Sequence, residues 1–312
     1  MPPRPPRTPR PPRPIHEPRR DDCPWCGSTR LRTRLRTPDL RHRHRPGTFT
    51  LDECRDCAHA FQNPRLTPEG LALYPADPVT AADRRRLRAT ARTMLAFPEP
   101  ESWLDVGTGD ARFPETAREL FTYTAFDGLD PTARVRRARA AGRVEEAHVG
   151  SLAAPELTSR LRARYDVVSM LHHLQHTSDP RAELRAAVTA LRPGGHLLVE
   201  LPDPSSASAS LLGKWWPAYD QPRHLHLIPP ANLRAELEAQ GCAVVSTDSS
   251  APHLPRDLAA AVRVRLSRTR MRAVARPASA LTLFLDLALS PVLRHTPFSN
   301  TYRLIARKTG GG

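Results

Sequence analysis

The stretch Trp103-Leu104-Asp105-Val106-Gly107-Thr108-Gly109-Asp110-Ala111-Arg112-Phe113 carries the strongest fold signal in the chain. An apolar run with one acidic residue breaks into a Gly-x-Gly turn, and a helical pattern follows. Glycines at the end of a strand let a ligand approach the backbone, because no side chain stands in the way. The start of the next helix adds unpaired N–H groups and the positive end of its dipole. The pattern predicts a ligand-binding turn between a strand and a helix.

Strand and helix patterns alternate from residue 101 onward, which predicts an α/β fold with a doubly wound parallel sheet. Strands are expected at 102–106, 124–129, 146–149, 166–170, 196–201, 242–246 and 301–306. Helices are expected between them at 113–121, 131–141, 155–163 and 180–191. Pro114 suits the first of these helices, since a proline in the first turn lacks only an N–H that the helix does not need.

The composition of the 312 residues bounds the class of protein, with 39% apolar residues and a net charge of +15. This length can bury one good core and a smaller module. The charge suggests an anionic partner, yet only Lys214 and Lys308 are lysines. A GC-rich genome produces such arginine, alanine and proline richness without selection. Nucleic acid is therefore a possible partner but not the favoured one.

Two segments outside the predicted sheet are low in complexity or rich in proline. Residues 1–20 are Pro/Arg repeats that predict a disordered tail, either a solvated extension or a partner-binding arm. Residues 65–100 predict a connector with one helix at 81–97 that leans over the active site.

Five cysteines include two tight pairs, and these predict a metal site near the N-terminus. Each Cys-x-x-Cys can hold one face of a tetrahedral ion, and two together form the closed ligand set of a structural zinc site. Alternating residues between the pairs predict two strands with a turn near Arg45-Pro46-Gly47, so residues 21–64 are expected to form a small zinc ribbon. The predicted ligands are Cys23, Cys26, Cys54 and Cys57.

Alternatives to this ribbon are a redox dithiol pair and ligation by nearby histidines. We expect His42, His44 and His59 to be surface residues, since four cysteines already complete the site. Paired cysteines suit a reducing compartment, so a cytoplasmic location is expected. No signal-peptide core is recognised, and no apolar run of about 18 residues is expected to span a membrane.

Three charged residues, Asp105, Arg112 and Asp130, indicate which ligand the glycine turn binds. A dinucleotide fingerprint needs a third glycine or alanine, but Arg112 occupies that position. Asp105 lies inside the strand, where a pyrophosphate would be repelled, and Asp130 closes the next strand, where it can bind ribose hydroxyls. These residues favour a phosphate-free adenosine compound with a positive charge, namely S-adenosylmethionine (SAM).

The chain from about 101 to 309 resembles the class I SAM-dependent methyltransferases. The resemblance is carried in order by Leu104 to Gly109, Gly128-Leu129-Asp130, Tyr165 to Val168 with His176 to Pro180, and Leu191 to Gly195 as the turn before the fifth strand. It implies a Rossmann-like seven-stranded sheet whose last strand, 301–306, runs antiparallel between the fifth and sixth. The ribbon and the segment 216–225 resemble a subgroup that often acts on small molecules or envelope glycans.

The resemblance implies how each residue acts on the cofactor. Gly107 and Gly109 admit the methionine part, Asp105 orients the loop or the amino group, and Asp130 binds the ribose. The alternatives are plain turn glycines at 107 and 109 and an ordinary turn cap at Asp130. At position 151 the family usually has an aspartate facing the adenine, and this chain has Ser151 instead. The cofactor-binding residues expected are Asp105, Gly107, Gly109, Asp130, Ser151, Met170 and Leu171, with plain core roles open for the last two.

Methyl transfer to an O, N or C nucleophile needs a base only where the acceptor holds its proton at neutral pH. Among the histidines expected at the carboxyl ends of the strands, His224 and His176 are the catalytic candidates, while a structural role stays open for each. Tyr219 and Arg223 are expected to shape the acceptor pocket. The favoured acceptor is a small molecule or saccharide. RNA is the first alternative, and a non-catalytic zinc and nucleic-acid-binding protein is the second.

An insert at about 256–298 interrupts the pattern before the last strand. A basic segment precedes an apolar patch at 280–293 that Asp286 interrupts. A lid or packed helical cap is expected, and a membrane-surface helix that meets a lipid-linked acceptor is the alternative. The basic residues are Arg263, Arg265, Arg268, Arg270, Arg272 and Arg276.

Overall fold

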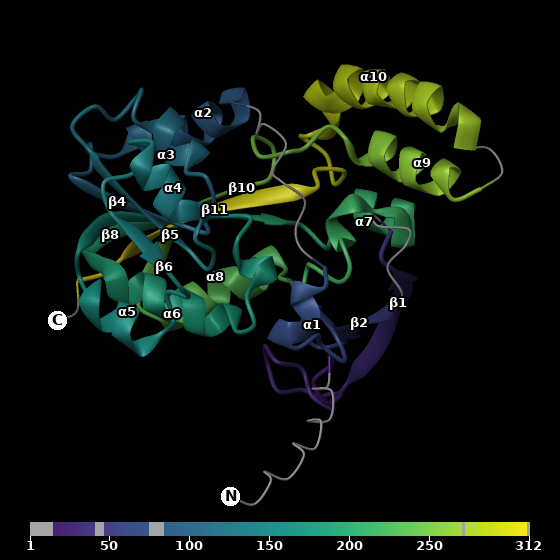
Figure 1. Ribbon diagram of the computed structural model, residues 1–312, viewed down its shortest axis with the longest axis horizontal. Coiled ribbons are helices and arrows are strands. Elements are labelled where there is room, and N and C mark those ends of the chain that lie inside the picture. The colour runs from purple at the N-terminus through teal and green to yellow at the C-terminus, as the bar shows by residue number, and fades with distance from the viewer. Residues whose placement is uncertain (1–14, 41–46, 75–83, 270–271, 311–312) are drawn as a thin grey trace, which may run out of the picture.

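A seven-stranded sheet forms the centre of the computed structural model, which describes residues 15–40, 47–74, 84–269 and 272–310 (Figure 1). Its strand order is β10-β11-β8-β7-β4-β5-β6, and β11 runs antiparallel to both of its neighbours. The predicted fold class is therefore confirmed. The strands are β4 (Ser102–Val106), β5 (Ala125–Asp130), β6 (Ala147–Val149), β7 (Tyr165–Leu171), β8 (Leu191–Pro202), β10 (Cys242–Asp248) and β11 (Thr301–Lys308).

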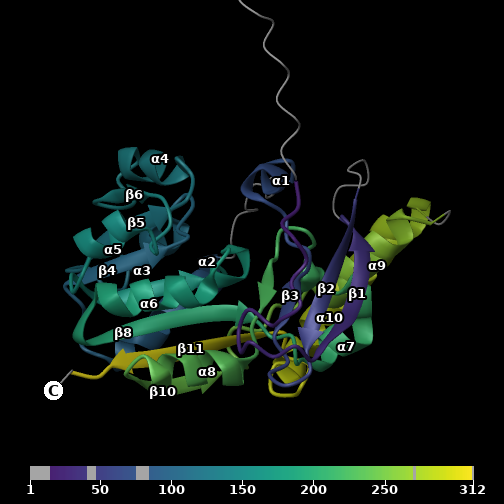
Figure 2. The ribbon, with the colours of Figure 1, turned by 90° about the horizontal axis from the view of Figure 1, so that it is seen from below.

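Helices cover both faces of this sheet (Figure 2). On one face α2 (Arg84–Arg92) and α3 (Arg112–Ala117) pack around Trp103, and on the other α5, α6 and α8 pack around Leu104. Neighbouring residues of one strand thus belong to opposite cores, as the period of two in a strand requires. The remaining sheet helices are α4 (Arg134–Ala140), α5 (Pro155–Arg160), α6 (Pro180–Ala190) and α8 (Pro230–Ala239).

Two boundaries differ from the predicted ones for local reasons. Helix α4 begins at Arg134 rather than at 131, because the Asp130 carboxylate accepts the N–H of Thr132 and holds the preceding residues in a turn. The turn expected at Leu191 to Gly195 is the first part of β8, where Leu191 pairs with Tyr165 before the register shifts.

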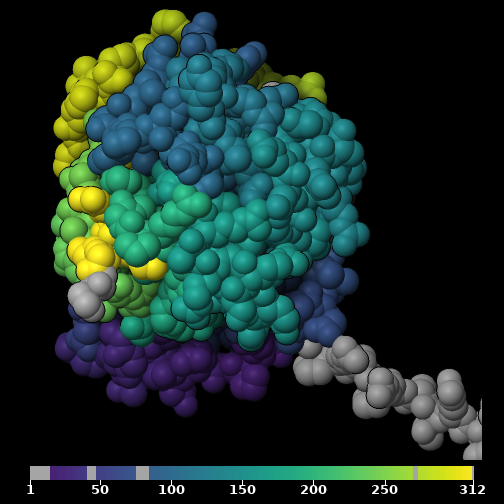
Figure 3. All heavy atoms as spheres, turned by 90° about the vertical axis from the view of Figure 1, so that its left-hand side faces the viewer, coloured from purple at the N-terminus to yellow at the C-terminus, as the bar shows by residue number. Residues whose placement is uncertain are grey.

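The cysteine-bearing segment forms a second, antiparallel sheet that is shared with the rest of the chain. It contains β1 (Leu31–Pro38), β2 (Thr48–Cys54), β3 (Ala60–Gln62) and β9 (His226–Leu227) in that order. The last of these strands follows β8 in sequence, so the ribbon is completed by the central domain. Figure 3 shows the purple N-terminal residues continuous with the teal surface of that domain. His42, His44 and most of the expected turn at 45–47 lie outside the described residues.

Residues 15–20 are held against the ribbon, although the sequence predicts disorder as far as residue 20. The Glu17 N–H donates to the Arg65 carbonyl at 2.8 Å, and Arg19 pairs with buried Asp52 at 2.5 Å. These partners lie more than thirty positions away in sequence, so local composition carried no sign of them. The rest of the predicted tail, residues 1–14, lies outside the described residues.

The predicted connector contains two helices instead of one. Helix α2 and the short η1 (Thr93–Ala96) fall within the predicted helix, while α1 (Pro68–Ala72), capped by Thr67, was not expected. Helix α2 reaches the carboxyl ends of β7 and β8, where Arg86 Nη1 lies 3.0 Å from His172 Nε2.

The insert folds into a helical hairpin of α9 (Asp257–Ser267), η5 (Arg272–Val274) and α10 (Ala275–Leu293). Helix α9 packs on the segment after β8, which contains α7 (Ala207–Leu212), η3 (Gly213–Trp215) and η4 (Pro217–Tyr219). Helix α10 packs on α9 and η5, buries only Ala275, and stands away from the sheet in Figure 1. The expected packed cap therefore describes α9 but is wrong for α10.

Helix α10 also corrects the expectation about membrane-spanning length. It is the one helix in the described part of the chain that is long and apolar enough to cross a membrane, by length and composition. The sequence prediction missed this because serine, threonine and proline residues and Asp286 interrupt the apolar run.

Candidate active site

The glycine turn after β4 adopts a backbone that only glycine fits. Gly107 has a φ of +75°, and a Cβ placed there would lie 2.5 Å from Nδ1 of His173. The N–H groups of Gly107 and Thr108 donate to the Leu129 carbonyl, which fastens the turn to the end of β5. The turn is thus fixed at the carboxyl edge of the sheet, where such folds bind ligands.

Asp130 lies at the end of β5 beside this turn, as predicted. Its Oδ2 accepts the N–H of Gly109 at 2.9 Å, and its Oδ1 accepts the Thr132 N–H at 2.8 Å and the Thr132 hydroxyl at 2.5 Å. The carboxylate therefore caps the turn, which was the alternative to ribose binding. Two oxygens have about four acceptor sites, so capacity for another donor is left.

Asp105 lies beneath the turn in a closed hydrogen-bonded chain. The Trp103 indole N–H donates to Ser169 Oγ at 2.9 Å, and that hydroxyl donates to Asp105 Oδ1 at 2.6 Å. Burial raises the pKa of Asp105 to about 6, despite the hydrogen bond from Ser169. A positive charge near this carboxylate would reverse that shift.

Glu183 of α6 is an acid near the glycine turn that was not predicted. It is buried, accepts the hydroxyl of exposed Ser151, and has Oε2 3.8 Å from Nε2 of His173. A carboxylate thus stands next to position 151, where the family's aspartate is missing. The available signal was an acid adjoining Leu184 in a helix with an apolar buried face.

The two residues expected on the adenine face differ in exposure. Met170 is fully buried in the sheet core, which matches the alternative of a plain core residue. Leu171 is half-buried at the end of β7 and stays a candidate.

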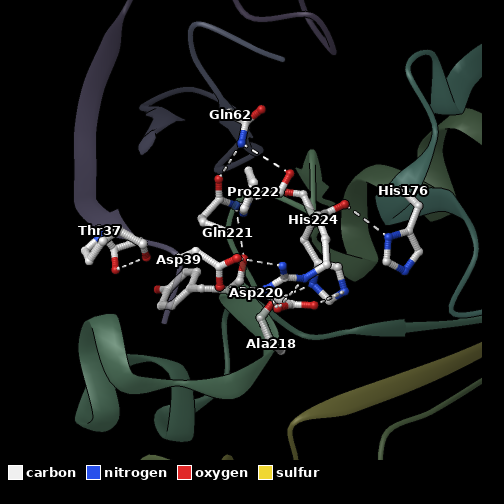
Figure 4. Close-up of polar contacts among 12 residues, drawn as sticks. Thr37, Asp39, Gln62, His176, Ala218, Asp220, Gln221, Pro222 and His224 are labelled. Atoms are coloured by element: carbon white, nitrogen blue, oxygen red, sulfur yellow. Dashed lines mark hydrogen bonds and ion pairs between the residues drawn. The ribbon is translucent and has the colours of Figure 1, made fainter. Parts of the chain in front are cut away.

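The structure brings His176 and His224 together from two loops, with ring centroids 4.7 Å apart (Figure 4). His224 Nδ1 lies 2.7 Å from the Ala218 carbonyl, and His176 Nδ1 lies 3.1 Å from the Arg223 carbonyl. A carbonyl can only accept, so each Nδ1 carries the proton and each Nε2 is a proton acceptor in the neutral ring.

The rings of His176 and His224 differ in exposure and in the charged groups near them. His176 is solvent-exposed, and loss of hydration among neighbouring protein atoms, followed by His224, lowers its pKa to about 3. His224 is 9% exposed, and its Nε2 lies 4.0 Å from Asp220 Oδ2. A carboxylate at that distance stabilises an imidazolium, so His224 is the better placed proton acceptor.

A buried ionic cluster that the sequence did not reveal lies at the ends of β7 and β8. Glu200 pairs with Arg303 at 2.5 Å and lies 3.9 Å from His172, which has a φ of +52°. Burial would raise the pKa of Glu200, yet Arg303 and Arg86 hold it below its usual range. Burial and Arg86 lower the pKa of His172 to about 3. The only sign in the sequence was a charge inside each of two apolar strands.

Arg223 and Tyr219 join the ribbon to the loop that carries His224. Arg223 is buried and pairs with Asp39 at 2.9 Å and Asp220 at 2.8 Å, while the Tyr219 hydroxyl accepts from Arg34 Nε at 2.8 Å. Both residues are therefore positioning groups at the joint. Arg34 and Tyr219 also line a cavity of about 500 Å³, together with Glu53, Ser205 and Lys214.

The four cysteines of the ribbon lie within 4.8 Å of one another by their sulfur atoms. Cys23 Sγ is 3.7 Å from Cys57 Sγ, and Cys26 Sγ is 3.6 Å from Cys54 Sγ. A zinc–sulfur bond of about 2.3 Å gives a tetrahedral edge of about 3.8 Å, so the donor set fits this ion.

His59 is fully buried, and the expectation that it lies on the surface is wrong. Its Nε2 lies 3.1 Å from Nδ1 of His226, and its ring stacks on Phe61 and approaches Trp25. Burial, then His226, lowers its pKa well below the usual range. This pair of histidines fills the joint between β3 and β9 instead of the metal site.

Comparison with known proteins identifies the family of the chain. A protein-family model described as a methyltransferase domain matches residues 80–247, more than half of the chain. A ubiquinone biosynthesis O-methyltransferase of Aeromonas salmonicida (strain A449) is 31% identical over 149 residues, 45% of this chain and 62% of the relative. One of Cronobacter sakazakii (strain ATCC BAA-894) is 34% identical over 96 residues, 30% of this chain and 39% of the relative.

The chain thus spans less than two thirds of the length of these curated relatives. Among solved structures, a SAM dependent methyltransferase from Archaeoglobus fulgidus is similar in fold, with a TM-score of 0.46 and 16% identity. The similar region covers 73% of this chain and 95% of that one.

Proposed function

We propose that this chain, which belongs to the methyltransferase-domain family, is a SAM-dependent methyltransferase that methylates a hydroxyl oxygen of a small molecule. The observation that carries this choice is the pair of histidines whose Nδ1 protons are both tied to backbone carbonyls. A hydroxyl acceptor needs a base because it holds its proton at neutral pH. The names of the curated relatives, O-methyltransferases, support the same acceptor atom.

In this proposal each group of the chain has one task. SAM supplies an activated methyl group on a good leaving group. The glycine turn admits it to the backbone, Asp130 binds its ribose, and Glu183 serves in place of the acid missing at position 151. His224 Nε2 takes the acceptor's hydroxyl proton while the acceptor oxygen is aligned with the methyl group, and Asp220 stabilises the imidazolium.

The proposal includes a structural zinc ion on the four cysteines and a saccharide as one class of acceptor. Four thiolates close the coordination shell, so this ion would hold the fold and leave no position for catalysis. The polar and charged lining of the cavity beside Tyr219 suits a ligand with many hydroxyls. A cytoplasmic location is part of the proposal, because none of the five cysteines is in a disulfide.

Replacement of Asp130 by asparagine is expected to weaken SAM binding by about 10- to 100-fold, the cost of one charge-assisted hydrogen-bonding group. Titration calorimetry measures this, with Asp21→Asn as the control at an exposed acid. Thermal unfolding of both variants shows whether the turn that Asp130 caps is still intact. If it is, weaker SAM binding is due to the lost ribose contact. Unchanged SAM affinity in a folded Asp130→Asn protein would contradict the assignment.

SAM affinity is also expected to depend on pH through Asp105. Its pKa is raised to about 6 in the free protein, and the positive charges of SAM favour the ionised form, so binding lowers this pKa and releases a proton. The dissociation constant should rise by up to about tenfold for each pH unit below 6 and stay level above 7. Calorimetry between pH 5 and 8 checks this, and Asp105→Asn should flatten the profile. A level profile for the wild type would remove Asp105 from the cofactor site.

The acceptor is tested by incubating the protein with labelled SAM and a panel of phenols, sugars and amines. Methyl transfer confined to amines would contradict the hydroxyl acceptor but leave the family unaffected. Binding to RNA with a steep salt dependence, and transfer to it, would replace the small-molecule acceptor.

A further inference from the structure

Helix α10 is amphipathic, but it turns its polar face toward the protein and its apolar face toward the solvent. A surface helix normally turns its apolar stripe toward the protein, but here the polar residues Ser279, Thr282, Asp286 and Ser290 are half-buried. The Asp286 carboxylate accepts the N–H of Ala259 at 2.9 Å, which directs this face toward α9. The large apolar side chains are exposed: Leu281 by 63%, Phe284 by 67%, Leu287 by 53% and Val292 by 65%.

Exposed arginines lie at both ends of this apolar face and on the neighbouring helix α9. Arg276 and Arg294 lie exposed at the two ends of α10, and Arg263 and Arg265 lie exposed on α9. Asp286, the only acid within α10, already bonds to α9. The hairpin therefore presents an apolar surface with a positive charge at each end of α10.

We propose that the Leu281, Phe284, Leu287 and Val292 face of α10 binds in the plane of a membrane that contains anionic lipids. Such a surface accepts apolar side chains at the level of the acyl chains and arginines at the level of the headgroups. A second copy of the chain fits the face less well, because its arginines would meet arginines of the same sign.

The packing of α10 against α9 favours a helix that lies on the membrane surface over one that crosses the bilayer. Helix α10 contacts α9, which carries Arg263 and Arg265 exposed. Burying α10 across a bilayer would draw these charges into hydrocarbon, which is costly. The hairpin is also tied to the enzyme body, since Trp216 Nε1 donates to Asp257 at 2.6 Å. Docking would therefore fix the orientation of the whole protein on the surface.

The test is co-sedimentation of the full chain with vesicles of phosphatidylcholine, with and without phosphatidylglycerol. The wild type should bind the anionic vesicles, and high salt should release most of it. Phe284→Gln/Leu287→Gln should lower the partition by about tenfold or more, whereas Tyr123→Gln, at an 88% exposed site outside the hairpin, should not. Arg276→Gln/Arg294→Gln should weaken binding only to the anionic vesicles, and Arg55→Gln/Arg136→Gln serves as its control.

Three outcomes would overturn the proposal. One is absence of vesicle binding, and another is a dimer that Phe284→Gln/Leu287→Gln dissociates in sedimentation velocity. The third is resistance to alkaline carbonate, the behaviour of a spanning helix. SAM titration of every variant shows whether the protein is folded, so failure of docking is distinguishable from failure of the proposed methyl transfer.

Discussion

Replacement of Cys54 by serine is expected to remove the zinc ion and unfold the ribbon, the largest change in stability that a single substitution should cause here. Cys54 is fully buried at the end of β2 and lies 3.6 Å from Cys26 by its sulfur. Structural zinc contributes about 10–16 kcal/mol in small domains, which is comparable with the whole stability of a typical domain.

Unfolding should not stop at the ribbon. Strand β3 pairs with β9, and Asp39 holds Arg223, which in turn holds Asp220 beside His224. Loss of the ribbon should therefore release the His224 loop and lower methyl transfer, while SAM still binds the glycine turn. This pattern of effects would separate a structural ion from a catalytic one.

Metal analysis and hydrogen exchange measure the two consequences for Cys54→Ser. We expect about one zinc per wild-type chain, none in the variant, and loss of amide protection in β1 to β3 but not in β4 to β8. Cys242→Ser is the matched control, because Cys242 is a buried free thiol in β10, away from the ribbon. A Cys54→Ser protein with its ribbon amides still protected would refute the zinc ribbon, and a disulfide in the wild type would favour the redox alternative.

Local patterns in the sequence were enough to predict the sheet and the glycine turn. The strand 102–106 was predicted with the bounds of β4, since its apolar residues lead directly into glycines that end the strand. Asp130 was predicted from its place at the end of the second strand, whereas the antiparallel β11 was expected only from the resemblance to the class I SAM-dependent methyltransferases. The four cysteines were found because metal ligation imposes a spacing that can be read directly.

Contacts between distant segments could not be predicted in this way. Strand β9 has two residues and pairs with β3, more than 160 positions earlier, so neither periodicity nor length marks it. Glu183 and the Glu200–Arg303 pair gain their partners only when the sheet assembles. Helix α10 was misjudged because an apolar pattern predicts a buried face, whereas this helix leaves that face exposed.

Replacement of His224 by alanine is expected to lower kcat by about 10²- to 10⁴-fold, the range for loss of a general base, with SAM affinity unchanged. Its Nε2 is the proton acceptor, since Nδ1 donates to Ala218 and Asp220 stabilises the charged ring. His176→Ala should cost less, because the surroundings of that ring lower its pKa and disfavour the protonated form. Steady-state kinetics of both variants, with His295→Ala at an exposed site as control, measure these effects.

The effect of removing His224 should depend on the acidity of the acceptor if His224 is a base, but not if its role is structural. If His224 removes a proton, the loss in the His224→Ala enzyme should shrink as the hydroxyl becomes more acidic, and a phenol that is already ionised at the assay pH should need no base. A structural role would give the same loss for every acceptor. Equal losses across a series of phenols would therefore move His224 from the chemistry to the loop joint that Arg223 and Asp39 hold together.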